Sequence, residues 1–231
     1  MCDLNSTIKY YDYLEPGSKP NANLGFLRVY LITDRTLLPR NRFLRGIESA
    51  LKGGIPALQL REKDLLPAEL LALAREVRDI TWDYGTKLFI NGHPEIAEMV
   101  EADGVHLGEN CETADEVKRS FPHLLIGVST HSQEAANEAE SQGADFITFS
   151  PIFETESKKQ YGPPQGLERL RKIAGKSSIP VLALGGIKKE KLSMIAKQGA
   201  YGIALISGIW GSPNIEQESY KYMQFFAGEP L

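Results

Sequence analysis

The segment that decides the fold is residues 181–210, which reads VLALGGIKKEKLSMIAKQGAYGIALISGIW. It holds one pattern twice: a short apolar run, Val181–Leu184 and then Gly202–Ile206, each followed by a glycine-bearing turn and the start of a helical stretch. A buried strand that alternates with an amphipathic helix is typical of βα units in a parallel sheet. The segment therefore predicts two consecutive βα units.

The same alternation extends upstream to Leu27. The clearest helix is predicted from Pro67 to Trp82, because Leu70, Ala74 and Val77 fall on one face at helical spacing. Other helices, the last running toward Phe226, are expected to begin near Asn41, Pro94, Thr113, Ser132, Gln165, Lys188 and Gly208. The strands are predicted at Leu27–Asp34, Ile55–Leu60, Lys87–Asn91, Gly104–His106, Leu124–Val128, Phe146–Phe149, Val181–Leu184 and Gly202–Ile206.

Eight strands alternating with eight helices predict an α/β protein with a single (β/α)8 TIM barrel over residues 27–231. A doubly wound sheet is the alternative, but it usually has fewer strands and needs a switch in strand order that the sequence does not show. Residues 1–26 lack periodicity and contain several Gly, Pro and Asn residues, so they are expected to form a short N-terminal extension.

Composition and charge exclude several classes of partner. The 231 residues carry 26 Lys plus Arg and 30 Asp plus Glu, a formal net charge of −4. Nucleic-acid binders that rely on phosphate contacts usually have a basic excess, so no nucleic-acid partner is expected. No apolar run is long enough for a signal-peptide core or a membrane span, so no membrane partner is expected. Cys2 and Cys111 fit neither a disulfide framework nor a metal knuckle, which favours a cytoplasmic location.

Basic residues gather where the predicted strands end. In a (β/α)8 barrel the catalytic groups follow the carboxyl ends of the strands. The mouth at this end is therefore expected to be locally positive and suited to an anionic ligand, although the whole chain is acidic. A chance grouping is the alternative. The residues are Arg35, Arg61, Lys63, Lys158 and Lys159.

Two successive turns, after the seventh and eighth strands, indicate a phosphate site. Gly185-Gly186 and Ser207-Gly208 each stand before a helix, where backbone N–H groups attract phosphate and glycine lets a ligand come close. This is the frequent phosphate site of the barrel. A Gly-Gly pair alone more often marks a plain tight turn, so the prediction rests on both turns together.

His131, just after the fifth strand, is the candidate general acid and base. The neighbouring hydroxyls of Ser129, Thr130 and Ser132 are expected to fix its tautomer. The alternative is a structural His131 that caps the following helix. No strand offers the paired spacing that preorganises a metal site, so no metal is expected. The other histidines at the same ends of strands are His93 and His106.

Seven motifs follow one another along residues 28–210: YLITDR, QLREKD, ADGVHLG, IGVSTHS, FETESKK, LALGGI and IALISGIW. In these motifs and their order the chain resembles the thiamine phosphate synthase and thiazole tautomerase family. The resemblance implies a (β/α)8 barrel and a role in making thiamine.

The resemblance also implies roles for single residues. Gly186, Ile206 and Ser207, together with Gly185 from the glycine turn, are expected to hold a thiazole phosphate through their backbone. A second set is expected to hold a pyrophosphate or a pyrimidine: Gln59, Arg61, Lys63, Asn91, Ser129, Thr155, Ser157 and Lys158.

The chain departs from the synthases of the family at two positions. Synthases join a pyrimidine methyl pyrophosphate to a thiazole phosphate, assisted by Mg²⁺ that two aspartates hold, and this chain has Gly92 and Cys111 there. Neither residue supplies the carboxylate oxygen that Mg²⁺ prefers. Glu62, Glu109 and Glu112 lie nearby, but none occupies a matching position. Mg²⁺ is therefore expected only if the synthase alternative holds.

The thiazole tautomerase branch is more similar, in Asn91-Gly92 followed by a basic residue and in the strings FPHLLIG, STHS, FETESKK and SGI. This similarity implies aromatisation of a thiazole carboxylate phosphate without a cofactor, with His131 as the proton carrier. That reaction is the expected function, and a phosphorylated thiazole is the expected partner. The alternatives are a thiamine phosphate synthase with an altered Mg²⁺ site and a noncatalytic regulator that binds thiazole phosphate.

Three further expectations concern lysines, a loop and assembly. A Schiff-base aldolase is a weaker alternative, because Lys87, Lys158 and Lys159 have no context that promises desolvation. The loop PIFETESKKQYGPP after the sixth strand is expected to close over the ligand, and a solvated loop is the alternative. The resemblance and the aromatic leader lead us to expect a homodimer.

Overall fold

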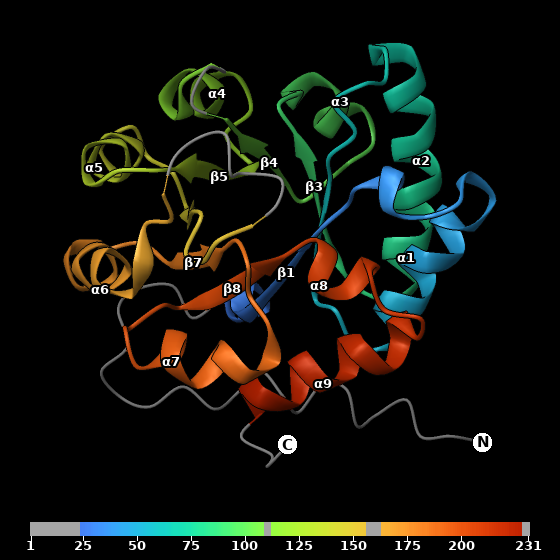
Figure 1. The fold of residues 1–231 in the computed structure, drawn as a ribbon. Coiled ribbons are helices and arrows are strands. Elements are labelled where there is room, and N and C mark those ends of the chain that lie inside the picture. The colour runs from blue at the N-terminus through green and yellow to red at the C-terminus, as the bar shows by residue number, and fades with distance from the viewer. Residues whose placement is uncertain (1–23, 109–111, 156–162, 228–231) are drawn as a thin grey trace.

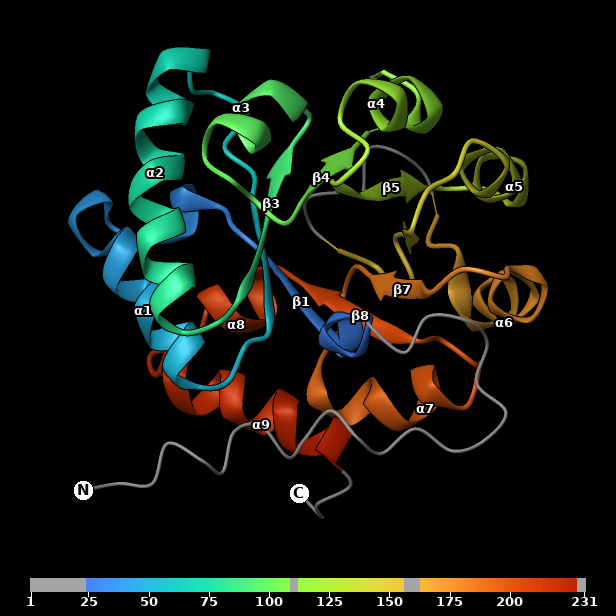
Figure 2. The same cartoon turned by 180° about the vertical axis from the view of Figure 1, so that it is seen from behind.

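The computed structural model describes residues 24–108, 112–155 and 163–227. Within these ranges eight parallel strands pair in chain order and close into a barrel, with the helices outside it (Figures 1 and 2). The predicted (β/α)8 fold is confirmed. The strands are β1 (Val29–Ile32), β2 (Ala57–Leu60), β3 (Lys87–Asn91), β4 (Gly104–Leu107), β5 (Leu125–Thr130), β6 (Phe146–Phe149), β7 (Val181–Leu184) and β8 (Gly202–Leu205).

The helices begin where the sequence supplies caps. Ser132 Oγ accepts from the amide of Ala135 at the start of α5, and Thr113 and Glu116 form a reciprocal capping box at α4. The helices are α1 (Phe43–Lys52), α2 (Pro67–Asp83), α3 (Pro94–Met99), α4 (Ala114–Ser120), α5 (Gln133–Ser141), α6 (Gly166–Lys176), α7 (Leu192–Ala196), α8 (Ser207–Trp210) and α9 (Ile215–Ala227).

A single last helix was expected to run from near Gly208 toward Phe226, and this prediction is wrong. Two helices, α8 and α9, occupy this stretch, and the chain between them contains Pro213. Proline has no backbone N–H and clashes with the preceding turn, so a helix does not continue through it. Helix α8 is fixed to the barrel instead, because Trp210 Nε1 donates to the carbonyl oxygen of Ile32 at 2.7 Å.

Aromatic side chains fill the barrel interior. Tyr30, Phe89 and Phe146 meet edge to face, with ring centroids 5.4 to 5.5 Å apart. Burial of each such ring contributes about 1.5–3 kcal/mol. Leu24 and Phe26, which the sequence assigned to the N-terminal extension, are buried in the same interior cluster. The extension itself stays a prediction, because residues 1–23 lie outside the described residues.

Glycines in two strands make room for these rings. A Cβ placed on Gly127 would lie 2.4 Å from Phe146 Cζ and 2.6 Å from His106 Nδ1. A Cβ on Gly104 would lie 2.5 Å from Phe89 Cε1. The barrel interior is thus a close-packed core that admits polar groups only at defined places. None of the described helices is long and apolar enough to cross a membrane.

Candidate active site

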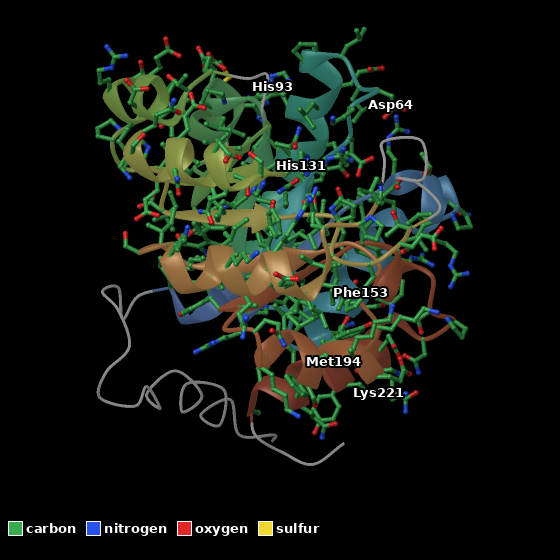
Figure 3. All side chains as sticks on the ribbon, turned by 60° about the vertical axis from the view of Figure 1, so that its left-hand side comes forward. Asp64, His93, His131, Phe153, Met194 and Lys221 are labelled. Carbon is green, nitrogen blue, oxygen red and sulfur yellow. The ribbon has the colours of Figure 1, made fainter. Side chains whose placement is uncertain are left out.

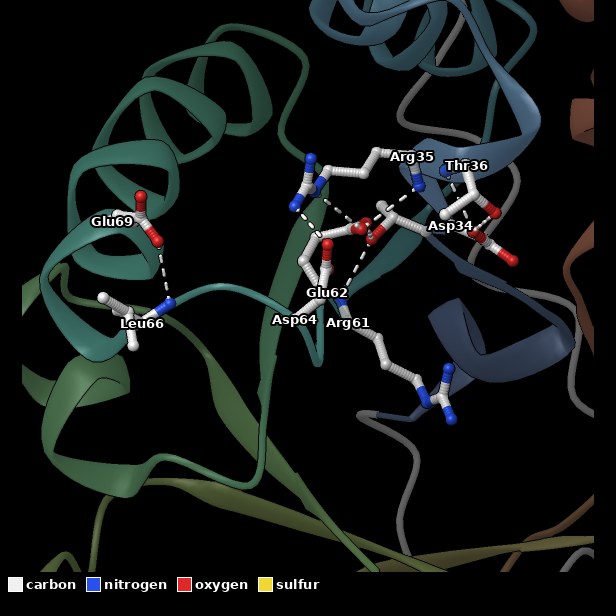
Figure 4. Close-up of polar contacts among 9 residues, drawn as sticks. Asp34, Arg35, Thr36, Arg61, Glu62, Asp64, Leu66 and Glu69 are labelled. Carbon is white, nitrogen blue, oxygen red and sulfur yellow. Dashed lines mark hydrogen bonds and ion pairs between the residues drawn. The ribbon is translucent and has the colours of Figure 1, made fainter.

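The loops after β1 and β2 are joined by a buried polar network (Figure 4). Thr33 Oγ1 donates to Glu62 Oε1 at 2.5 Å, and the backbone amide of Arg35 donates to Glu62 Oε2 at 3.1 Å. The guanidinium of Arg35 lies 3.6 Å from Glu62 Oε2 and 2.5 Å from Asp64 Oδ2. Arg35 was expected to help make the mouth locally positive, but in the structure it lies against two carboxylates, Glu62 and Asp64.

Arg61 differs from Arg35 although it adjoins Glu62. Its backbone amide donates to Thr33 Oγ1 at 2.9 Å. Its side chain points away from the pairing of Glu62 with Arg35, as Figure 4 shows, and its guanidinium makes no ion pair with any described residue. Within the described chain, Arg35 and Arg61 therefore differ in whether a carboxylate pairs with them.

A chain of polar groups runs through the barrel interior below Arg61. Gln59 Nε2 donates to Tyr30 Oη at 3.2 Å, and Tyr30 Oη lies 3.4 Å from His106 Nδ1. His106 Nε2 lies 3.1 Å from Ser129 Oγ. The chain therefore ends on a half-buried hydroxyl, Ser129, at the end of β5.

His106 is neutral in this chain. Complete burial, followed by the positive charge of Arg61, lowers the pKa of His106 to about 3. A ring that cannot take a proton at neutral pH is no general base, but it can orient the hydroxyl of Ser129. The sequence placed His106 on the rim, whereas it lies within β4 and is 2% exposed. Its register opposite Gly127 was the missed signal, because only a residue without a side chain leaves space for the ring.

His131, labelled in Figure 3, follows β5, and its ring contacts the loop after β6. Its Nδ1 lies 2.7 Å from the carbonyl oxygen of Ser150. A carbonyl only accepts, so Nδ1 carries the proton and Nε2 is left with the lone pair of a base. The hydroxyls of Ser129, Thr130 and Ser132 were expected to fix the tautomer of His131, and that expectation is wrong.

Each of those three hydroxyls has another partner. Ser129 faces His106, and Thr130 Oγ1 donates to the carbonyl oxygen of Thr148 at 3.1 Å. Ser132 is the N-cap of α5, so His131 does not cap that helix either. The ring of His131 is thus held through Nδ1 by Ser150, which follows β6. Its second nitrogen, Nε2, contacts no polar group of the described residues.

The two glycines after β7 are required by the neighbouring loop. Gly185 and Gly186 have φ angles of +101° and +64°, which L side chains rarely adopt. A Cβ on Gly186 would lie 2.7 Å from the carbonyl oxygen of Glu154 and 2.8 Å from Phe153 Cβ. Both glycines were expected to let a ligand come close, whereas the close approach in the structure is to the loop after β6.

The turns after β7 and β8 lie together, as predicted. A Cβ on Gly208 would lie 3.3 Å from the carbonyl oxygen of Ile187. Within the described part of the chain, the amides of Gly186, Ser207 and Gly208 donate to no acceptor. Lys191 reinforces the first turn: its Nζ donates to the carbonyl oxygen of Gly186 at 3.3 Å and lies 4.0 Å from the ring centroid of Phe153.

Other predicted site residues have the following places. Gln59 is buried, Asn91 and Thr155 are half-buried, and Lys63 is exposed on the loop after β2. Lys63 and Thr155 both interact with other groups. The remaining predicted residues on the long loop and in the altered metal site, Ser157, Lys158, Lys159, Glu109 and Cys111, lie outside the described residues.

Comparison with known proteins assigns the chain to a family. Residues 29–209 match the family model described as thiamine monophosphate synthase. A putative thiamine-phosphate synthase 2 of Aquifex aeolicus is 51% identical over 180 residues, which cover 78% of this chain and 96% of that protein. A thiamine-phosphate synthase of Syntrophomonas wolfei is 40% identical over 200 residues, which cover 86% of this chain and 95% of that protein.

The chain belongs to the thiamine monophosphate synthase family. It is therefore an enzyme of thiamine biosynthesis. A solved structure agrees: thiamine phosphate pyrophosphorylase from Pyrococcus furiosus has a TM-score of 0.81 and 35% identity, over 88% of this chain and 98% of that one. A 3-hexulose-6-phosphate synthase, with a TM-score of 0.64 and 18% identity, shares the fold.

The described residues of this family member do not fit Mg²⁺. Gly92, after β3, has no side chain, and its amide donates to the carbonyl oxygen of His106 at 2.9 Å. Both oxygens of Glu62 are engaged by Thr33 and Arg35. The described ranges contain no group of three or more His, Cys, Asp or Glu residues that could hold a metal ion. No step of the reaction is therefore assigned to a metal here.

Proposed function

We propose that the protein is a thiamine-phosphate synthase, which joins a pyrimidine methyl pyrophosphate to a thiazole phosphate and releases pyrophosphate. The observation that carries this proposal is the similarity, along nearly the whole barrel, to relatives named for that reaction. It replaces the thiazole tautomerase as the first candidate, because the relatives' names favour what the sequence left as an alternative.

The pyrophosphate end of the substrate is assigned to Arg61. Its guanidinium has no competing carboxylate within the described residues, and a planar guanidinium forms paired hydrogen bonds with phosphate oxygens. Lys63 and Lys158 are proposed to share the charge that develops on the departing pyrophosphate. Cations placed beside a departing pyrophosphate stabilise the negative charge that builds up on it.

The pyrimidine is assigned to the polar end of the barrel interior. Gln59, Asn91 and Ser129 come from three strand ends, and the buried His106 holds Ser129 at 3.1 Å. Amide and hydroxyl groups of this kind select a heterocycle by hydrogen bonds, and fixed groups lower the cost of ordering it. Thr155 and Ser157 are proposed to close this side of the site.

The thiazole phosphate is assigned to the turns after β7 and β8. Gly185, Gly186, Ile206 and Ser207 form the proposed cradle, in which backbone N–H groups face the phosphate. The support is the amides of Gly186 and Ser207, which donate to no acceptor within the described ranges, together with the left-handed backbone that directs the first turn. Such amides bind phosphate without any cationic side chain.

A thiazole tautomerase is the second candidate, favoured by two specific observations. Gly92 stands where a metal-binding carboxylate is expected, and His131 has a fixed tautomer with a basic Nε2. Such a ring can remove one proton and deliver another while a phosphate anchors the substrate. A noncatalytic regulator that binds thiazole phosphate is the outcome if neither reaction occurs.

One experiment separates these candidates. The protein is incubated with both phosphorylated precursors, with Mg²⁺ or with EDTA, and separately with the thiazole carboxylate phosphate. Formation of thiamine phosphate supports the synthase. Aromatisation of the carboxylate without thiamine phosphate overturns it in favour of the tautomerase. A homodimer and a cytoplasmic location stay predictions.

A further inference from the structure

We propose that Thr33, Glu62 and Arg35 form a positioning network that fixes the backbone of Arg61 and presents its guanidinium, which has no ion pair among the described residues, to an anion. This inference rests on the proposed role of Arg61 as a ligand of the pyrophosphate group. Thr33 and Glu62 are positioning residues in this account, because they act through Arg61 and are not proposed to touch the substrate.

The hydrogen bonds of the network form one directed chain. The amide of Arg61 donates to Thr33 Oγ1 at 2.9 Å, and the same hydroxyl donates its proton to Glu62 Oε1. The amide of Thr33 donates to the carbonyl oxygen of Gln59 at 2.9 Å, so the ends of β1 and β2 are joined twice. Thr33 is 0% and Glu62 6% exposed, so water does not compete for these bonds.

The charges of the network explain why Arg61 is available. Glu62 is occupied by Thr33 on one oxygen and by Arg35 on the other, so neither oxygen is left for a second cation. Arg35 extends this pairing to Asp64. The side chain of Arg61 points away from this pairing (Figure 4), as neighbouring side chains at a strand end usually do.

Burial of the Glu62 carboxylate costs free energy, so a buried Glu62 without a structural role is not expected. Desolvation, only partly offset by the hydrogen bond from Thr33, raises the pKa of Glu62. A negative charge next to an anion site also opposes binding by simple electrostatics. A buried carboxylate that carries both costs is expected where it fixes the geometry of a binding residue. Arg61, the next residue along the chain, is the binding residue proposed here.

Calorimetric titration with inorganic pyrophosphate tests the network on the full chain. Thr33→Val is expected to weaken binding about tenfold, because the amide of Arg61 loses its acceptor, and Thr33→Ser is expected to restore it. Thr86→Val is the matched control: Thr86 is also a buried threonine, its hydroxyl donates to the carbonyl oxygen of Ile55, and it precedes β3 at the other end of the barrel. This control is expected to lower the melting temperature and leave the affinity unchanged.

Glu62→Met gives a second test, because two explanations predict opposite changes in the affinity for pyrophosphate. Removal of a negative charge strengthens pyrophosphate binding if only electrostatics matters. The positioning role predicts weaker binding instead, because Thr33 and Arg35 lose the group that holds them. Tighter binding by a folded Glu62→Met variant, or unchanged binding by a folded Thr33→Val variant, would overturn the proposal.

The double variant shows whether Thr33 acts through Arg61. In an Arg61→Ala background, Thr33→Val is expected to cause no further loss of pyrophosphate affinity. An equal further loss would overturn the positioning role while leaving the anion role of Arg61 intact. An Arg61→Ala variant with wild-type affinity would overturn both the anion role and the positioning role.

Discussion

The Nδ1 atom of His131 lies 2.7 Å from the backbone carbonyl oxygen of Ser150. This contact joins the end of β5 to the loop after β6 and places the basic lone pair on Nε2. Nε2 is the nitrogen that the proposed tautomerase reaction would use for proton transfer.

His131→Asn tests the use of that group. If the enzyme also aromatises thiazole carboxylate phosphate, the variant is expected to lose about a hundredfold in that rate, because asparagine cannot accept the proton. Thiamine phosphate formation, which is not assigned a proton transfer by His131, is expected to stay near the wild-type rate. Equal loss of both activities, measured on the same samples, would indicate damage to the site and would contradict a role in proton transfer alone.

His106 predicts how stability depends on pH. Its pKa is about 3 in the folded protein and near 6.5 when the chain is unfolded, so only the unfolded state takes up a proton between these values. The stability is therefore full above the unfolded pKa and is lost as the pH falls from about 6.5 toward 3. Urea unfolding at pH 7 and pH 5 is expected to show a drop that is smaller by about 2 kcal/mol in His106→Gln. The same drop in both proteins would contradict a neutral, buried His106.

Gly127→Ala tests the packing of the barrel interior. The added Cβ would lie 2.4 Å from Phe146 Cζ, so the ring cluster has to shift and the free energy of unfolding is expected to fall by about 1–3 kcal/mol. Gly175→Ala is the control, because no atom lies within 4 Å of its added Cβ and it stands in α6. Alanine favours a helix, so this control is expected to gain about 0.5–1 kcal/mol.

Gly186→Ala separates backbone strain from loop contact. Gly186 and Gly85 share a φ of +64°, but only Gly186 has a neighbour, the carbonyl oxygen of Glu154 at 2.7 Å from its added Cβ. Gly85→Ala is expected to cost about 1–2 kcal/mol of stability through strain alone. Gly186→Ala is expected to cost more and to weaken the binding of thiazole phosphate, measured by calorimetry. Wild-type phosphate affinity in a folded Gly186→Ala would remove this turn from the cradle.

The sequence predicts the fold well wherever burial alone sets the pattern. The strands Lys87–Asn91, Phe146–Phe149 and Val181–Leu184 were predicted with the observed bounds, because each is an apolar run that packs on both faces. The break before α9 was missed although Gly211 and Pro213, residues that commonly end helices, mark it in the sequence.

The site was less predictable, because its residues depend on contacts between distant loops. Arg35 and Arg61 look alike in sequence, yet only the fold brings Glu62 and Asp64 to Arg35 and leaves the guanidinium of Arg61 without an ion pair in the described chain. The support of His131 by Ser150 likewise joins two strand ends that lie 19 residues apart. A pattern along the chain places such residues on one rim but does not pair them.

The most direct test of the synthase assignment is the stoichiometry of product release from the two phosphorylated precursors. Thiamine phosphate and pyrophosphate are measured together for the wild type and for Arg61→Ala. Equal amounts of both products are expected from the wild type, and a strong loss of both is expected in the variant. Pyrophosphate and thiamine phosphate both absent from the wild type, while thiazole carboxylate phosphate is aromatised, would contradict the synthase assignment.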